Sequence, residues 1–324
     1  MQRTISRRAA LVAALGLAVP ARAGRAQAWP TRPLRILVPA VPGGATDIVT
    51  RAVAQPMGEQ LGQSVVAENR AGGSGLIALD TVMASPPDGY TLLLVTEGNP
   101  MGPNMYKDWK PDPVRSLEYI TLLGRGMFIV VVHPSSPADT LAELIEQARQ
   151  SPQPMLYATP GVGQRLVFEQ LKSLNKFRAD NVAYKGGAQA VADLVSGHIK
   201  VGVLGLPPAI PHVRAGRLRA LAVSGLQRSA ALPDVPTVAE LGFPGFEFTQ
   251  WQGLGAPAGT PAEIIDRLHR EALRAMALQA TIDKLATIGM DNSTSAAPAA
   301  FTDFIRRETD RWPPLFKTAG IQPE

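Results

Sequence analysis

The sequence of 324 residues contains no cysteine. This absence excludes disulfide bonds, thiol catalysis, thiolate metal sites and a lipid anchor attached to a cysteine. Aromatic residues are also few, at 6% of the chain, while hydrophobic residues reach 45% and charged residues 18%. This balance excludes a disordered or fibrous chain and predicts a soluble globular protein with enough residues for two compact domains.

Acidic residues are absent from the first 28 positions, which carry five arginines. These are Arg3, Arg7, Arg8, Arg22 and Arg25. Without that segment, the total of lysine and arginine falls from 32 to 27 and equals the 27 aspartates and glutamates, so the formal charge of +5 becomes zero. The basic character therefore belongs to the N-terminus, and we expect no nucleic-acid partner.

Residues 1–28 have the three parts of a bacterial export signal: basic residues, an apolar run from Ala9 to Val19, and the small-residue exit Ala26-Gln27-Ala28. The apolar run is about half the length that spans a bilayer, which argues against a retained membrane helix. We therefore expect cleavage near Ala28 and a periplasmic mature protein. The pair Arg7-Arg8 hints at the twin-arginine export route.

From Trp29 onward, short apolar runs alternate with helical patterns, as in strand–helix–strand units. We predict an α/β fold of two domains, each a mostly parallel sheet flanked by helices, with a hinge between them. The predicted first domain comprises residues 29–123 and 249–324, and the second comprises 124–248. The chain would cross between them near Leu123–Gly126 and Phe246–Gln250.

Four glycine-rich turns follow predicted strands and open predicted helices: Pro42–Asp47, Gly72–Gly75, Pro160–Gly163 and Lys185–Gly187. Helix starts expose unpaired N–H groups and a partial positive charge, so such turns bind anions without a basic side chain. Thr46, Ser74 and Thr159 would add hydroxyl donors. Ordinary helix entries in any α/β protein also need such glycines, and the repetition in two domains is what favours a site.

Other chemistries find little support in the sequence. The run Gly73–Ala78 has the spacing of a dinucleotide fingerprint, but the turn before it is too long, and neither a phosphate-binding loop nor a nucleophile elbow is present. The four histidines are isolated in sequence and lack metal-ligand spacing. We therefore predict no catalytic residue, no metal and no cofactor. Trp251 is expected either beside a cleft or in the core of the hinge.

Several collinear segments resemble one family. They are VPAVPGGATDIVTRAVAQPMGEQLGQSVVAENRAGGSG, ASPPDGYTLLL, YATPGVG, VAYKGGAQAVADLVSG and the stretch from RAGRLRALAVSG through APAGTPAEII. The family is that of the tripartite tricarboxylate transporter substrate-binding proteins, also called Bug or TctC proteins. The resemblance implies a type II-like, Venus-flytrap periplasmic binding protein, monomeric and not an enzyme, that delivers a small carboxylate to a membrane permease.

Carried onto this chain, the resemblance implies a ligand site at the turns of both domains. In the first domain it comprises Val41, Gly43, Gly44, Ala45, Thr46, Asp47, Gly73, Ser74, Gly75 and Thr96. In the second it comprises Thr159, Gly161, Gly163, Lys185, Gly186 and Gly187. Two further candidates, Glu97 and Gln164, depart from the family pattern, as do Val167 and Lys200. An anionic Glu97 at the mouth of the cleft could select a ligand that bears an amine or an amide.

Two alternative functions stay open at this level. The same scaffold could serve a sensor whose liganded form docks on a membrane receptor, or it could carry a periplasmic enzyme, because a fold does not dictate a function.

Overall fold

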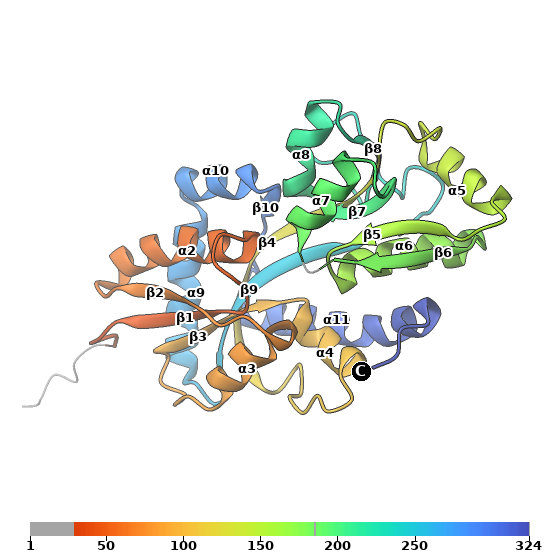
Figure 1. Ribbon diagram of the computed structural model, residues 1–324. Coiled ribbons are helices and arrows are strands. Elements are labelled where there is room, and N and C mark those ends of the chain that lie inside the picture. The colour runs from red at the N-terminus through yellow and green to blue at the C-terminus, as the bar shows by residue number, and fades with distance from the viewer. Residues whose placement is uncertain (1–28, 185, 324) are drawn as a thin grey trace, which may run out of the picture.

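A computed structural model describes residues 29–184 and 186–323. The predicted export signal and Lys185 lie outside the described residues, as does the side chain of Ser74. Figure 1 shows two lobes joined by the long strands β4 (Leu117–Val132) and β9 (Thr249–Pro257).

The first lobe is built on a mixed sheet with the strand order β2-β1-β3-β9-β4, and β10 pairs with β4. Its other elements are β1 (Leu34–Val38), α2 (Ala45–Leu61), β2 (Val65–Asn69), the short 3-10 helix η1 (Gly73–Gly75), α3 (Leu76–Met83), β3 (Thr91–Thr96), α4 (Gly98–Met105), α9 (Ala262–Met276), α10 (Gln279–Thr287) and β10 (Met290–Asn292). Strands β1, β2 and β3 run parallel, whereas β9 is antiparallel to both β3 and β4.

The second lobe uses the end of β4 as a strand of its own sheet, with the order β4-β7-β5-β6 and with β8 also pairing to β4. Its elements are α5 (Leu141–Gln150), β5 (Met155–Thr159), α6 (Val162–Asn175), β6 (Ala179–Ala183), α7 (Gly187–Val195), β7 (Val201–Gly205), α8 (Leu206–Arg214) and β8 (Arg219–Val223). Strands β5, β6 and β7 are parallel, and β4 is antiparallel to β7 and β8.

Helices cover both faces of each sheet, which explains why the inner strands read as continuous apolar runs. In the first lobe, α2 and α9 cover one face of the sheet, and α3 with the start of α11 (Pro298–Ala319) covers the other. In the second lobe, α5 and α6 lie on one face, and α7 and α8 on the other. All five residues of β7 are buried, and β3 is buried except for its last residue.

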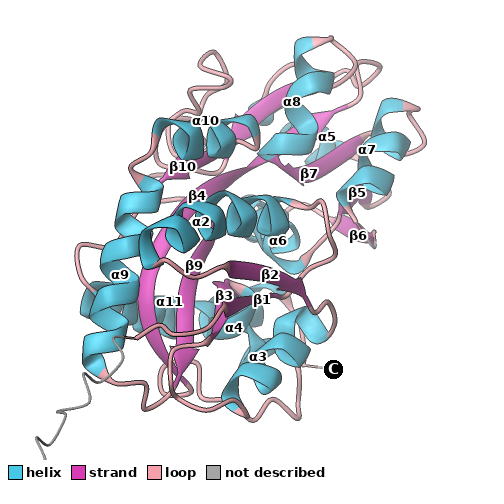
Figure 2. Ribbon diagram, turned by 90° about the vertical axis from the view of Figure 1, so that its left-hand side faces the viewer, coloured by secondary structure: helices cyan, strands magenta, loops and turns pink. Residues whose placement is uncertain are grey.

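Strands β4 and β9 form the junction between the lobes (Figure 2). The last residue pair between them is Met127 with Thr249, and from Phe128 onward β4 pairs with β7 of the second sheet. One strand carries the chain out of the first lobe and the other returns it, so the two run in opposite directions and pair antiparallel. This return explains why the sheets contain more antiparallel pairing than the sequence pattern suggested. The division into two domains stays a prediction.

The C-terminal helix α11 packs against both lobes. Phe301 and Ile305, near its start, belong to the core cluster of the first lobe around Trp251. Trp312 and Phe316, near its end, belong to the core cluster of the second lobe with residues of β4, β7 and α6. The helix therefore bridges the junction and connects the two cores (Figure 1).

Trp312 tests this bridging role because it is 1% exposed and its indole N–H has no hydrogen-bond partner in the described part of the chain. Trp312→Ala is expected to lower the free energy of unfolding by about 3–5 kcal/mol, through lost burial and the cavity left behind. Trp312→Phe, which keeps a ring and removes the unpaired N–H, should cost less than half as much. Chemical denaturation followed by circular dichroism measures both, and equal effects of the two variants would contradict the packing argument.

Candidate functional site

A cavity of about 310 Å³ lies between the two lobes, at the junction. Its lining residues come from the first lobe, the second lobe and the crossing strand β9. They are Pro39, Thr46, Thr96, Glu97, Gly98, Met101, Met105, Gly161, Val162, Gly163, Gln164, Gln250 and Gln252. The loops after β1, β3 and β5 meet here because the carboxyl ends of parallel strands share one edge of a sheet.

Six of the residues predicted from the sequence line this cavity. They are Thr46, Thr96, Glu97, Gly161, Gly163 and Gln164. The other described candidates lie in the same turns or beside them and do not line the cavity: Val41, Gly43, Gly44, Ala45, Asp47, Gly73, Gly75, Thr159, Gly186 and Gly187. The Val41 side chain is 65% exposed, at the tip of its loop.

The sequence reasoning missed two glutamines of the crossing strand. Gln250 and Gln252 flank Trp251 on β9 and both line the cavity. Because alternate residues of a strand point to the same face, the spacing of these two glutamines was a signal that they share a face opposite to Trp251. On β4 they are opposed by Gly126 and Gly124, and a Cβ on Gly126 would lie 2.7 Å from Nε2 of Gln250.

Trp251 lies in the core of the hinge and not in the cleft. It is fully buried, its ring packs edge-on against Phe301 and Phe304, and its Nε1 donates a hydrogen bond of 3.0 Å to Oε2 of Glu308. Of the two positions left open by the sequence, the structure therefore supports the hinge core.

Asp47 is held by three donors at the start of α2. Its carboxylate is 4% exposed and accepts hydrogen bonds from the Gly43 backbone N–H, the Arg51 Nε–H and the Asn69 side-chain amide, each at 3.0 Å. Asn69 also donates to the carbonyl of Ala40 at 3.0 Å. The hydrogen bond from Arg51, helped by Gly43 and Asn69 and opposed by burial, lowers the pKa of Asp47 to about 2. Asp47 thus fixes the loop between β1 and α2 against the end of β2.

Two of the site glycines are required by close packing. At Gly163, an added Cβ would lie 2.9 Å from the ring of Phe128, so any larger residue would push α6 away from β4. Gly75 has a φ of +99°, a left-handed conformation, and a Cβ there would lie 3.2 Å from Pro39. These glycines bring the loop backbones close together at the edge of the cavity.

Three helices that begin in the cavity lining have no side-chain cap. They are α2, preceded by Gly44, α4, preceded by Glu97, and α6, preceded by Gly161. The start of α7, preceded by Gly186, also has no side-chain cap but does not line the cavity. The first N–H groups of a helix need partners from outside it, and the helix dipole places partial positive charge there. Helix starts from both lobes can therefore receive an anion.

Thr159 and Gln164 of the second lobe both have contacts within that lobe. The Thr159 hydroxyl oxygen accepts a hydrogen bond of 2.6 Å from the side-chain amide of Asn181, and the residue is 2% exposed. Gln164 lies across the start of α6, because its Oε1 is 2.8 Å from where a Cβ on Gly161 would stand. The amide of Gln164 therefore shares the cavity wall with the helix start.

Among the described residues, Glu97 is the one ionisable residue in the cavity lining. Burial is the main cause that raises the pKa of its carboxyl to about 7, and the charge of Glu308 adds to the effect. The backbone N–H groups of Glu97 and Trp251 act in the opposite direction without cancelling it. The cavity thus has an acidic group whose charge is poorly compensated.

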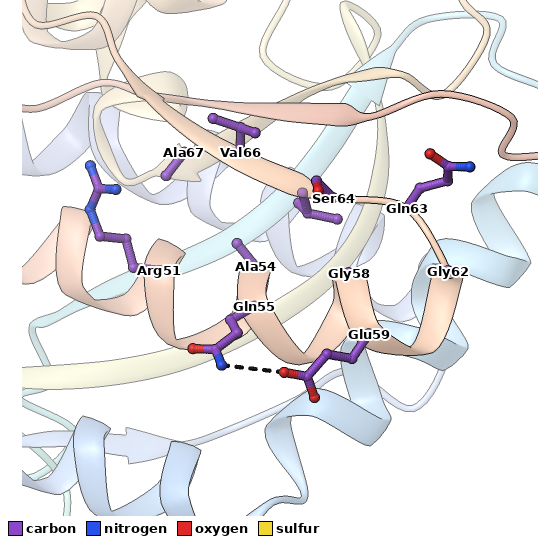
Figure 3. Close-up of a pocket in the computed structure, with 11 residues that line it drawn as sticks. Arg51, Ala54, Gln55, Gly58, Glu59, Gly62, Gln63, Ser64, Val66 and Ala67 are labelled. Atoms are coloured by element: carbon purple, nitrogen blue, oxygen red, sulfur yellow. Dashed lines mark hydrogen bonds between the residues drawn. The ribbon is translucent and has the colours of Figure 1, made fainter.

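A larger groove of about 690 Å³ lies elsewhere on the first lobe, between α2 and the edge strand β2 (Figure 3). Its side chains include Arg51, Gln55, Glu59 and Gln63, and the Gln55 amide donates to Glu59 at 3.2 Å. It contains none of the residues predicted for the ligand site and no surface of the second lobe. We therefore place the candidate site in the smaller cavity at the junction.

In the part of the chain that the structure describes, no group of three or more His, Asp or Glu side chains could hold a metal ion. Within those same ranges, no helix combines the length and the apolar character needed to cross a membrane.

Comparisons with known proteins point to one family. A family model described as "Tripartite tricarboxylate transporter family receptor" matches residues 49–321. Rpa4515 of R. palustris, solved with adipate, has a TM-score of 0.82 and 34% identity over 91% of this chain and 100% of that chain. The periplasmic binding protein BugD has a TM-score of 0.79 and 30% identity, covering 91% and 100%. MatC from Rhodopseudomonas palustris, solved with bound malate, has a TM-score of 0.77 and 27% identity, covering 89% and 99%.

The Asp47 cluster predicts a pH-dependent contribution to stability. Its pKa is about 2 in the folded protein and ordinarily 3.8, so the contribution is complete above the ordinary value and disappears as the pH falls through the folded one. Asp47→Asn is expected to lower the free energy of unfolding by about 2 kcal/mol at neutral pH, and by less in acid. Urea titrations across pH measure this, with the exposed Asp80→Asn as control. A pH-independent loss would contradict the assignment.

For Glu97, the contribution to stability is predicted to depend on pH in the opposite direction. Its pKa is about 7 when folded and ordinarily 4.5, so folding disfavours the charged form, and stability falls as the pH rises from the ordinary value toward the folded one. Glu97→Gln should therefore stabilise the ligand-free protein by about 2 kcal/mol near pH 8 and have little effect near pH 4. Thermal unfolding at the two pH values measures this difference, and a destabilised variant near pH 8 would show that the carboxylate is well paired.

Proposed function

Because this chain belongs to the tripartite tricarboxylate transporter family of receptors, we propose that it captures a small organic acid between its two lobes and delivers it to the membrane permease of such a transporter. The family is one of solute-binding proteins and not of enzymes, and the chain has the predicted α/β periplasmic binding protein fold. The observation that carries the proposal is the cavity of about 310 Å³ at which uncapped helix starts from both lobes meet.

The ligand carboxylate would be bound mainly by the first lobe. The N–H groups at the start of α2, from Ala45 and Thr46, and the Thr46 hydroxyl are donors at the cavity edge. The turn at Gly73–Gly75 lies at the carboxyl end of the neighbouring strand β2, and Asp47 fixes the loop that precedes α2. Backbone donors held in this way bind an anion without a basic side chain. Adipate and malate, the ligands of Rpa4515 and MatC, are both carboxylates.

The second lobe would complete the site when the lobes close. Gly161 and Gly163 lie at the start of α6, and Gly186 and Gly187 at the start of α7, on the far side of the junction. The crossing strands β4 and β9 would bend, and α11 would limit the movement because its side chains belong to both cores. A ligand that binds both lobes favours the closed form, which is the form a permease can distinguish.

We also propose that the mature protein acts in the periplasm as a monomer. BugD, with 30% identity over 91% of this chain, is a periplasmic binding protein. The three-part segment before Trp29 supports export, with the paired arginines at positions 7 and 8 favouring the twin-arginine route.

A ligand screen tests the proposal. Purified mature protein is heated with mono-, di- and tricarboxylates, aromatic acids and amino acids, and a ligand present at about a hundred times its Kd should stabilise the native state by about 2.7 kcal/mol. At least one carboxylate is expected to raise the melting temperature. A screen in which no acid does so would contradict an organic-acid receptor.

The Thr46 hydroxyl provides a matched pair of variants. Thr46→Val is expected to weaken carboxylate binding by about tenfold, because it removes a donor and keeps the shape of the side chain. Thr81→Val is the control, since the Thr81 hydroxyl bonds to the Ile77 carbonyl within α3, away from the cavity. Isothermal titration calorimetry measures the affinities, and an equal loss in both variants would place the effect on folding instead of on the site.

A further inference from the structure

The cavity between the lobes is asymmetric in charge. Uncapped helix starts supply N–H donors, whereas Glu97 is the one ionisable side chain of the lining and no lysine, arginine or histidine lines the cavity among the described residues. The remaining polar lining side chains are Thr46, Thr96 and the three glutamines. A bound molecule can therefore place an anionic group at the helix starts. The group that it places beside Glu97 faces the carboxyl of that residue.

Glu97 has no ion-pair partner in the described part of the chain. It follows β3 and directly precedes α4, and neither these elements nor β9 contains a charged residue. The charge that acts on it is that of Glu308 on α11, which is anionic as well. The cation of that region, Arg311, is already paired with Glu308 at 3.2 Å, and Arg125 lies over the ring of Phe304 and 4.0 Å from Glu247.

A second acceptor of the cavity lining also lacks a partner. Gln252 is 4% exposed, its Nε2 donates to the Thr46 hydroxyl at 3.4 Å, and its Oε1 has no hydrogen-bond partner among the described residues. Gln252 pairs with Thr96 across the β3–β9 ladder, and Gln252 and Glu97 both line the cavity. A buried acceptor without a donor is costly, so Gln252 favours a ligand that brings a donor.

We propose that the ligand is an amino-carboxylic acid, whose carboxylate binds the helix starts and whose ammonium group, at the other end of a short chain, binds Glu97. This inference rests on the proposed function and names its ligand class. Glu97 is then the specificity-determining residue: its carboxylate forms a charge-assisted hydrogen bond with an ammonium and repels the second carboxylate of a diacid. Gln252 Oε1 is a further acceptor in the lining of the same cavity.

The cavity of about 310 Å³ is at the lower end of the range for small-molecule pockets, so short-chain acids are the appropriate probes. Adipate and 6-aminohexanoate have chains of similar length and differ only at one end. They are therefore a matched pair for testing the group that faces Glu97.

The uncompensated carboxyl agrees with this assignment. Burial without a cation raises the pKa of Glu97 to about 7, and an ammonium bound beside it would lower that pKa again. The groups to be considered around it are Glu308 and Arg311 on α11, Arg125 on β4, and Arg165 on α6, which lies 3.9 Å from Glu169. Affinity for an ammonium ligand should therefore rise with pH through the neutral range, while affinity for a diacid should fall.

Calorimetry with matched ligands tests the proposal. The probes are adipate, glutarate and succinate, the ω-amino acids of the same lengths, and hexanoate, which has neither second group. The wild-type protein is expected to bind at least one ω-amino acid about tenfold more tightly than the diacid of equal length. Glu97→Gln should remove that preference, and Glu59→Gln, in the groove between α2 and β2, should keep it.

Each result has a defined meaning. If the wild-type protein prefers diacids, or if Glu97→Gln leaves the ratio unchanged, the role of Glu97 is overturned while the organic-acid receptor stands. If none of these acids binds the wild-type protein, the proposal for Glu97 is overturned, and the receptor proposal is decided by the wider ligand screen. Because Glu97→Gln is expected to be at least as stable as the wild type at neutral pH, a loss of binding cannot be confused with unfolding.

Discussion

The antiparallel pairing of β4 with β9 is the interaction on which the rest of this structure depends. Strand β4 carries the chain from the first lobe into the second, and β9 returns it. On one face of this pair, Gln250 and Gln252 of β9 line the cavity. On the other face Trp251 packs against α11, which also inserts Trp312 into the second core. Cleft and hinge are thus two sides of one pair of strands.

Two carboxyl groups of the first lobe show how position decides chemistry. Asp47 and Glu97 both lie at the junction of a strand and a helix, within the same lobe. Three donors converge on Asp47 and favour its charged form, so it stabilises the loop that it fixes. Glu97 has backbone N–H groups nearby but no cation beside it among the described residues, and desolvation favours its neutral form. The arrangement around Asp47 is that of a structural residue, and the arrangement around Glu97 is that of a residue that can bind a ligand.

Part of the candidate site could be read from the sequence and part could not. The glycine-rich turns indicated where strands end and helices begin. Six of the predicted site residues do line the cavity: Thr46, Thr96, Glu97, Gly161, Gly163 and Gln164. The prediction could not separate the glycines that pack from those that border the cavity: Gly163 is required by Phe128, a residue of a distant strand. Met101 and Met105 were missed because a short helix with a proline gives no clear apolar pattern.

The sequence by itself determined the α/β class, the family and the turns at which an anion can bind, because strand and helix periodicity and glycine positions are local properties of the chain. The tertiary structure alone decided that Trp251 is a hinge residue, that Asp47 is occupied by its own loop and that α11 connects the two cores. It also decided that Glu97 lines the cavity without a cation beside it among the described residues. Such facts depend on which distant side chains approach one another, and no local pattern encodes the distance between residues that are far apart in sequence.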